Sequence, residues 1–132
     1  MRLIGPTGPN NRSAYFDSVN AGKKGIRLNL KEETDRHTLL DLLKDADVLL
    51  ESFRPGVMAK LGLSFDDLLD HEPQLVICSL NGYGTESPLS QEVGHDLNYL
   101  AMNGLLSGTG TEEETVAPWP PIADSASSLY GL

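Results

Sequence analysis

Two titratable side chains, His95 and Asp124, each stand at the predicted start of a helix in the second half of the chain. His95 precedes an apolar helical stretch over residues 97–106, and Asp124 opens the stretch that runs to the last residue. An imidazole and a carboxyl group that flank one small organic group are suited to moving a proton on and off carbon. An aspartate at a helix start is more often a cap, so this structural alternative stays open.

The elements that must position these two groups alternate between strands and helices. Strict alternation over residues 26–30 predicts a strand, and Thr34 is predicted to cap a leucine-striped helix that reaches Ala46. Residues 48–50 predict a second strand. A helical turn or two is expected over residues 57–61.

The start of a second helix, at Ser64, is marked more clearly than the helix start at Thr34. Ser64 is predicted to cap it, with Leu63 stapled against Leu68, and Pro73 should end it. The continuous apolar run over residues 75–80 predicts a strand buried on both faces of a parallel sheet.

This order predicts an α/β fold with a parallel, Rossmann-like βαβαβ sheet, in which ligands gather at the carboxyl ends of the strands. The chain is expected to form a single partial domain over residues 1–132, with a loop-rich segment over residues 1–22. Both ends are expected to be truncated, since three strands make a thin sheet and the helix over residues 125–132 has no stop signal.

The charge is uneven along the chain, which has a net charge of −9. Residues 1–60 hold ten basic and eight acidic residues, whereas residues 61–132 hold eleven acidic and no basic ones, so the parts carry +2 and −11. The overall charge argues against nucleic acid as a partner. The basic residues either decorate a solvated face or form a cationic patch for an anionic ligand. The patch would consist of Arg12, Lys23, Lys24, Arg27 and Lys31.

Other features of the sequence limit the classes of function that the chain can have. No stretch approaches the apolar length of a membrane span, and the single cysteine, Cys78, predicts a buried core residue in a reducing compartment. There is no nucleotide-binding glycine loop, and the three histidines lack metal-ligand spacing. His37 and residues 112–114 are expected in solvent, His71 near a helix end, and Trp119 packed inward.

Five segments then follow one another in a specific order. They are residues 22–31 (GKKGIRLNLK), 46–57 (ADVLLESFRPGV), 61–63 (LGL), 73–77 (PQLVI) and 80–84 (LNGYG). In this order and spacing they resemble the family III CoA-transferases of the CaiB/BaiF type, which include the α-methylacyl-CoA racemases. The first two are similar to the family's N-x-G-K-(K/R)-S-(I/L)-x-L-D-L-K and A-D-V-x-(I/L)-E-x-F-R-P-G-V. The resemblance extends from residue 18 to residue 129.

Within the family, residues 94–99 (GHDLNY) resemble the racemase segment G-H-D-I-N-Y, whereas transferases of the formyl-CoA type usually lack that histidine. The resemblance implies that His95 and Asp124 are catalytic. It also implies that the CoA thioester contacts Leu28, Asn29, Leu30, Lys31, Gly94, His95, Asp96, Leu97, Asn98 and Tyr99, with Arg54 as a weaker candidate at the CoA end or a residue that holds its own loop.

As a racemase, the enzyme would epimerise the α-carbon of a 2-methylacyl-CoA by two-base proton transfer, with the backbone N–H of Asp96 facing the enolate oxygen. Asp124 would then hold a proton near neutral pH, which calls for its burial. Two alternatives remain: a CoA-transferase in which Asp124 attacks the thioester to form an acyl anhydride, and a non-catalytic remnant.

The resemblance implies no cofactor beyond coenzyme A as part of the substrate, no metal, no membrane and an interlocked homodimer for the full-length form. The protein is expected inside the cell, with cytoplasmic, mitochondrial and peroxisomal locations not distinguished. Some residues depart from the family pattern. Asn29 replaces the usual aspartate, Gly25 replaces a serine, and residues 126–128 (ASS) stand where the family has two glycines.

Overall fold

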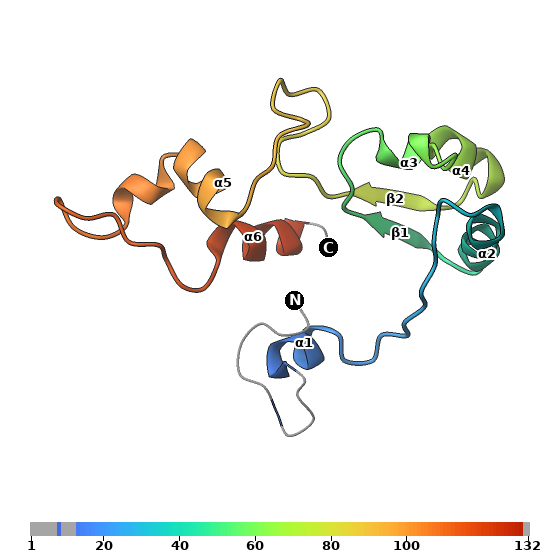
Figure 1. Cartoon of the computed structure of the whole chain (residues 1–132), viewed down its shortest axis with the longest axis horizontal. Coiled ribbons are helices and arrows are strands. Elements are labelled where there is room, and N and C mark those ends of the chain that lie inside the picture. The colour runs from blue at the N-terminus through green and yellow to red at the C-terminus, as the bar shows by residue number, and fades with distance from the viewer. Residues whose placement is uncertain (1–7, 9–12, 131–132) are drawn as a thin grey trace.

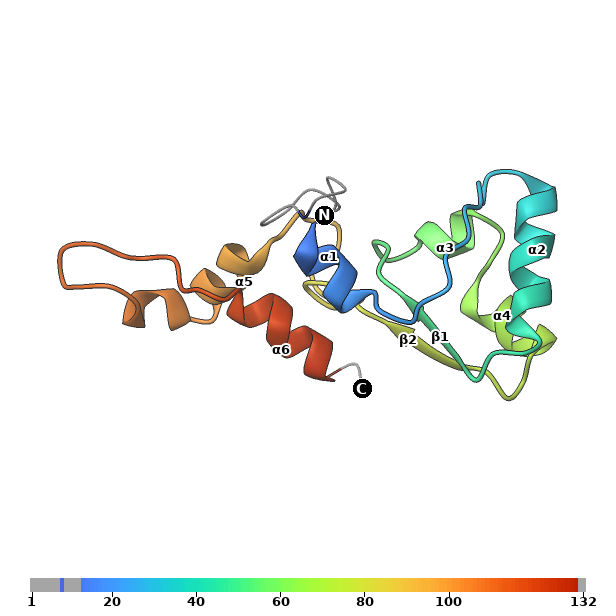
Figure 2. The same cartoon turned by 90° about the horizontal axis from the view of Figure 1, so that it is seen from below.

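The computed structural model describes residue 8 and residues 13–130. The elements in chain order are α1 (Ala14–Val19), α2 (Glu33–Leu43), β1 (Val48–Glu51), α3 (Val57–Lys60), α4 (Phe65–His71), β2 (Val76–Ser79), α5 (Asp96–Met102), the 3-10 helix η1 (Leu105–Gly108) and α6 (Ile122–Tyr130). Figures 1 and 2 show two regions at opposite ends of the long axis. We call residues 28–79 the sheet unit and residues 94–130 the helical arm.

The sheet of the described residues has two parallel strands, β1 and β2, which pair in the register Val48 with Val76 through Glu51 with Ser79. The predicted α/β class and parallel pairing are therefore confirmed. The predicted strand over residues 26–30 is wrong, because this segment runs as unpaired chain into α2. A strand needs a partner strand for its backbone groups, and among the described residues the sheet consists of β1 and β2 alone.

The core of the sheet unit lies between the sheet and the three helices α2, α3 and α4, which cover one face (Figure 2). On the other face, the side chains of Val48, Leu50 and Val76 are more than half exposed. The expectation that the strand over residues 75–80 is buried on both faces is therefore wrong, and Cys78 is half-buried rather than a core residue. The buried cluster consists of Leu43, Met58, Leu63, Leu68 and Leu75.

The helix starts in the sheet unit follow local hydrogen bonds. The hydroxyl oxygen of Ser64 accepts the backbone N–H of Asp67 at 3.1 Å, which confirms Ser64 as the cap of α4. Thr34 is not a cap, because α2 already begins at Glu33. A turn between Asn29 and Glu32, closed by a backbone hydrogen bond of 2.8 Å, delivers the chain into the helix earlier than expected.

The segment over residues 1–22 is not all loop, because α1 forms within it. The hydroxyl oxygen of Ser13 accepts the backbone N–H of Phe16 at 3.1 Å and so caps this helix. Arg12, which the sequence places in the cationic patch, lies outside the described residues.

The helical arm begins as expected, with His95 as the N-cap residue of α5. Its long connection to α6 leaves Trp119 88% exposed, so the expectation that Trp119 packs inward is wrong. This tryptophan stands between prolines in an extended stretch, and the apolar core of the described residues lies in the sheet unit. In the described part of the chain, no helix has the length and apolar character needed to span a bilayer.

Candidate active site

His95 stands at the entrance to α5, as its N-cap residue. Its backbone N–H donates to the Oδ1 atom of Asn98 at 3.0 Å, and its carbonyl accepts the backbone N–H of Asn98 at 2.9 Å. Asn98 therefore fixes the backbone of His95 from the first turn of the helix. The His95 side chain stays exposed, so its imidazole is accessible to a substrate.

Asp124 lies in the first turn of α6 and is tied to α5. The carboxylate oxygen Oδ1 of Asp96 accepts the backbone N–H of Ala123 at 2.7 Å and that of Asp124 at 3.1 Å. Asp96 thus caps a helix that begins 26 residues further along the chain. Because Asp96 follows His95 directly, the two predicted catalytic residues are brought to the junction where α5 meets α6 (Figure 1).

Tyr99 packs one turn into α5 against the loop that follows β2. A Cβ atom on Gly82 would lie 2.0 Å from the Tyr99 hydroxyl oxygen, and one on Gly94 would lie 2.7 Å from it, so a larger residue at either position would force the Tyr99 ring to shift. The rings of Tyr99 and Tyr83 meet edge to face at a centroid distance of 5.2 Å. The pKa of the Tyr99 phenol is raised by burial first, and then by Tyr83 and the charge of Asp124.

Both predicted catalytic side chains are open to solvent in this structure. The expected burial of Asp124 is therefore wrong for the described residues, since α6 presents this residue on an exposed surface. The backbone N–H of Asp96 is the first of α5 and has no acceptor within the helix, as is usual at a helix start. A substrate oxygen is one partner that this N–H group suits.

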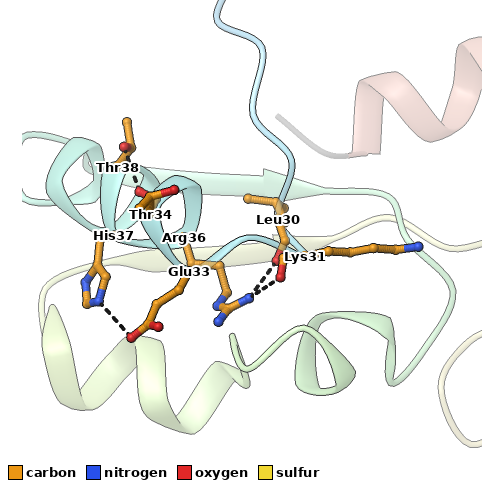
Figure 3. Close-up of polar contacts among 7 residues, drawn as sticks. All are labelled: Leu30, Lys31, Glu33, Thr34, Arg36, His37 and Thr38. Atoms are coloured by element: carbon orange, nitrogen blue, oxygen red, sulfur yellow. Dashed lines mark hydrogen bonds and ion pairs between the residues drawn. The ribbon is translucent and has the colours of Figure 1, made fainter.

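Segment 28–31 lies at the start of the sheet unit rather than in the helical arm. The guanidinium Nη1 atom of Arg36 donates to the carbonyl oxygens of Leu30, at 3.1 Å, and Lys31, at 3.0 Å (Figure 3). The Asp35 carboxylate accepts the backbone N–H of Asn29 at 2.6 Å. Two side chains of α2 thus hold the segment. The Lys31 ammonium extends away from the Arg36 guanidinium (Figure 3).

Arg54 lines a small pocket of about 190 Å³ at the carboxyl ends of β1 and β2. The loop that carries it is held by other residues: the buried carboxylate of Glu51 accepts the backbone N–H of Phe53 at 2.7 Å, and the Gln91 side-chain amide donates to the carbonyl of Pro55 at 3.1 Å. The exposed Arg54 side chain is thus available for an anionic ligand. The pocket is lined by Glu51, Arg54, Pro55, Gly56, Met58, Phe65, Ser79 and Thr85.

The structure therefore divides the predicted site residues into two groups. Residues 94–99 and Asp124 converge in the helical arm, while residues 28–31 and Arg54 belong to the other end of the molecule. The side chains of Lys23, Lys24 and Arg27 are exposed, as a cationic patch requires. Among the described residues, no three His, Cys, Asp or Glu side chains are placed to hold a metal ion.

Three contributors to the site were missed in the sequence: Arg36, Tyr83 and the side chain of Asp96. Arg36 sits on a helix that the pattern already predicted, but its backbone partners are set by the turn before that helix. Tyr83 is in a segment that the family resemblance includes, which was a usable signal. The bonds from Asp96 to residues 123 and 124 had no local signal, because they join distant parts of the chain.

Comparison with known proteins gives this arrangement its context. The whole chain, residues 1–132, matches the family model of CoA-transferase family III. The acetyl-CoA:oxalate CoA-transferase of Acetobacter aceti is 43% identical over 121 residues, which cover 92% of this chain and 30% of that protein. The α-methylacyl-CoA racemase of Mus musculus is 43% identical over 101 residues, which cover 76% of this chain and 26% of that protein.

The fold agrees with solved structures of the same family. A CAIB/BAIF family protein from Brucella suis superimposes with a TM-score of 0.88 at 30% sequence identity, over 98% of this chain and 36% of that chain. The chain thus spans about 30% of the length of the curated relatives it matches. The expected family is confirmed: the chain belongs to CoA-transferase family III.

Proposed function

We propose that this chain carries the two proton-transfer groups of an α-methylacyl-CoA racemase-like enzyme. The observation that supports this reading is the convergence of His95 and Asp124, which are joined through the Asp96 carboxylate at the junction of α5 and α6. Racemisation needs two such groups on opposite faces of one carbon atom. The similarity to the racemase of Mus musculus supports the same reaction class.

In the proposed reaction, neutral His95 removes the α-proton of a 2-methylacyl-CoA, and the electrons of the C–H bond move to the thioester oxygen. The backbone N–H of Asp96 donates to this developing enolate oxygen, since it has no acceptor within its helix. Substrate bound over α6 would cover the Asp124 side chain, which is exposed in this structure, and would let it hold the proton that it then delivers to the opposite face of the carbon. The reverse direction exchanges the roles of the two groups.

The CoA portion is proposed to lie along residues 28–31 and Arg54. These segments are held by Arg36, Asp35 and Glu51, which leaves the Lys31 and Arg54 cations exposed. If both cations face CoA phosphates, charge-removing changes at either should weaken thioester binding more at low salt than at high salt. Unchanged binding of both variants across that range would contradict this placement.

A second candidate is CoA transfer, and the comparisons provide the specific support for it. The acetyl-CoA:oxalate CoA-transferase aligns over 92% of this chain, a longer stretch than the racemase. In that reaction the Asp124 carboxylate attacks the thioester carbon, forms an acyl anhydride and releases CoA as the thiolate. The thiolate would then attack the aspartyl carbonyl of the anhydride and release the first acid. The incoming carboxylate would run the same steps in reverse and leave as the new CoA thioester, with the α-hydrogen in place throughout.

The test uses a protein of the relatives' full length that contains this segment, incubated in D₂O with each enantiomer of a 2-methylacyl-CoA. A racemase introduces deuterium at the α-carbon. His95→Ala should lower this exchange by about 100-fold to 10,000-fold, the usual loss for a positioned acid–base group. Transfer of CoA to a second acid without α-deuteration, with hydroxylamine trapping at Asp124, would contradict the racemase and support the transferase.

A further inference from the structure

One polar side chain of the helical arm has a geometric role that the proposed chemistry does not use. The Asp96 carboxylate does not cap its own helix. Its Oδ1 atom accepts the N–H groups of Ala123 at 2.7 Å and Asp124 at 3.1 Å, in the first turn of α6. A carboxylate that receives two N–H groups at a helix start also interacts favourably with the helix dipole.

The hydrogen bonds to the Asp96 carboxylate connect the neighbourhoods of the two predicted catalytic residues. Asp96 is the residue after His95, and one of its two donors is the backbone of Asp124 itself. The first turn of α6 receives its cap from α5, while the backbone N–H of Ser125 is already bonded to the carbonyl of Pro121 at 3.2 Å. Side-chain bonds from α5 therefore set the position of the Asp124 backbone relative to His95.

Apolar packing supplies little of this constraint. Leu100 is the buried apolar residue of the arm, whereas Leu97 on α5, Ile122 and Leu129 on α6 are exposed. Two helices with so little shared core hold their relative position mainly through directional hydrogen bonds.

We propose that Asp96 is the positioning residue that sets the spacing between His95 and Asp124. This inference rests on the proposed proton-transfer function. The backbone N–H and the side chain of Asp96 have separate tasks. The N–H faces the substrate oxygen, and the carboxylate positions Asp124, the second proton-transfer group. Asp96→Ala removes only the second task, because the alanine backbone keeps its N–H group.

The kinetic test compares the two enantiomers of a 2-methylacyl-CoA in D₂O, with the full-length protein. For the enantiomer whose α-hydrogen faces His95, Asp96→Ala should retain deuterium exchange while inversion falls by about 100-fold, as expected for a catalytic group displaced by about 1 Å. For the other enantiomer, exchange and inversion should fall together. Asp96→Asn keeps an oxygen acceptor at the same place and should restore most of the inversion.

A second measurement does not depend on turnover. Hydrogen–deuterium exchange of a peptide over residues 121–130 should show two amides losing protection in Asp96→Ala, while peptides from β1 and β2 stay unchanged. Asp66→Ala is the matched control, because Asp66 lies in the first turn of α4 and should leave the peptide over residues 121–130 unchanged.

The outcomes distinguish a failure of the proposed function from a failure of the positioning role of Asp96. If the parent protein neither exchanges nor inverts the substrate, the proposed function fails, and amide exchange alone decides whether Asp96 holds the first turn of α6. If the parent inverts the substrate and Asp96→Ala keeps the same ratio of inversion to exchange for both enantiomers, the positioning role is overturned. Equal losses in Asp96→Ala and Asp96→Asn would overturn it as well, since the oxygen acceptor would then not matter.

Discussion

The sheet unit and the helical arm are held together by different forces. The sheet unit buries five large apolar side chains between its two strands and three helices. The helical arm has one buried apolar residue, Leu100, and depends on the Asp96 carboxylate and on Tyr99 packed against two glycines. Burial of a leucine contributes about 1.5–3 kcal/mol, whereas a hydrogen bond contributes about 0.5–1.5 kcal/mol.

This difference separates the two candidate proton-transfer groups from the main apolar core. The candidate proton-transfer groups, His95 and Asp124, lie in the region with little core and remain exposed. A close-packed interior would leave no room for a substrate, but hydrogen bonds fix direction without enclosing the groups they position. We therefore expect changes in the sheet unit to affect folding, and changes in the arm to affect local geometry.

The largest expected effect is in the core of the sheet unit. Leu68 is 1% exposed, and Leu68→Ala should lower the free energy of unfolding by about 2–5 kcal/mol, because it leaves a cavity among packed leucines. Denaturant unfolding measures this loss. Leu69→Ala is the matched control on the same helix, with its side chain 39% exposed, and should cost far less. Equal losses in both variants would show that the cluster is not the stabilising core.

The next effect should appear where the arm meets the loop after β2. Gly82→Ala places a Cβ atom 2.0 Å from the Tyr99 hydroxyl oxygen, and the overcrowding should cost about 1–3 kcal/mol. Near-ultraviolet circular dichroism of the tyrosines should change at the same time. Gly25→Ala is the control, since no atom lies within 4 Å of its added Cβ. An unchanged tyrosine spectrum in Gly82→Ala would mean that Tyr99 is not packed there.

Titration of Tyr99 tests the packing of this side chain in the helical arm. Its pKa is raised above the ordinary 10.0 by burial, by Tyr83 and by Asp124, so folding favours the protonated phenol. The associated stability is complete below pH 10.0 and is lost as the pH rises through the raised pKa. Absorbance of tyrosinate measures this, and Tyr99→Phe should remove the component that ionises last. Its persistence in that variant would assign the raised pKa to another tyrosine.

The smallest effect should come from an exposed ion pair on α2. The Lys44 ammonium lies 2.7 Å from the Asp41 carboxylate and lowers the pKa of this group below its ordinary 3.8. The stabilising effect is present above that value and is lost as the pH falls through the lowered pKa. Lys44→Ala should return the carboxyl to ordinary titration, as followed by NMR, with no detectable change in the unfolding midpoint. A clear loss of stability would contradict the view that apolar packing dominates this unit.

Features that depend on neighbouring residues could be predicted from the amino-acid sequence alone. The periodicity and caps predicted α4 with Ser64 at its start, α5 after His95 and α6 with Asp124 in its first turn. The order of five segments identified the family. Caps, helix stripes and short segments are set by side chains within a few residues of one another, so they can be read along the chain.

Which elements pack against or pair with one another became clear from the three-dimensional structure. Residues 26–30 alternate as a strand should, yet they have no partner strand among the described residues, and the apolar strand β2 has one face uncovered. In the same way, only the fold brought Asp96 to the backbone of residues 123 and 124. Strand pairing, burial and long-range hydrogen bonds each require a second segment, and the local pattern of one segment does not specify which other segment will lie against it.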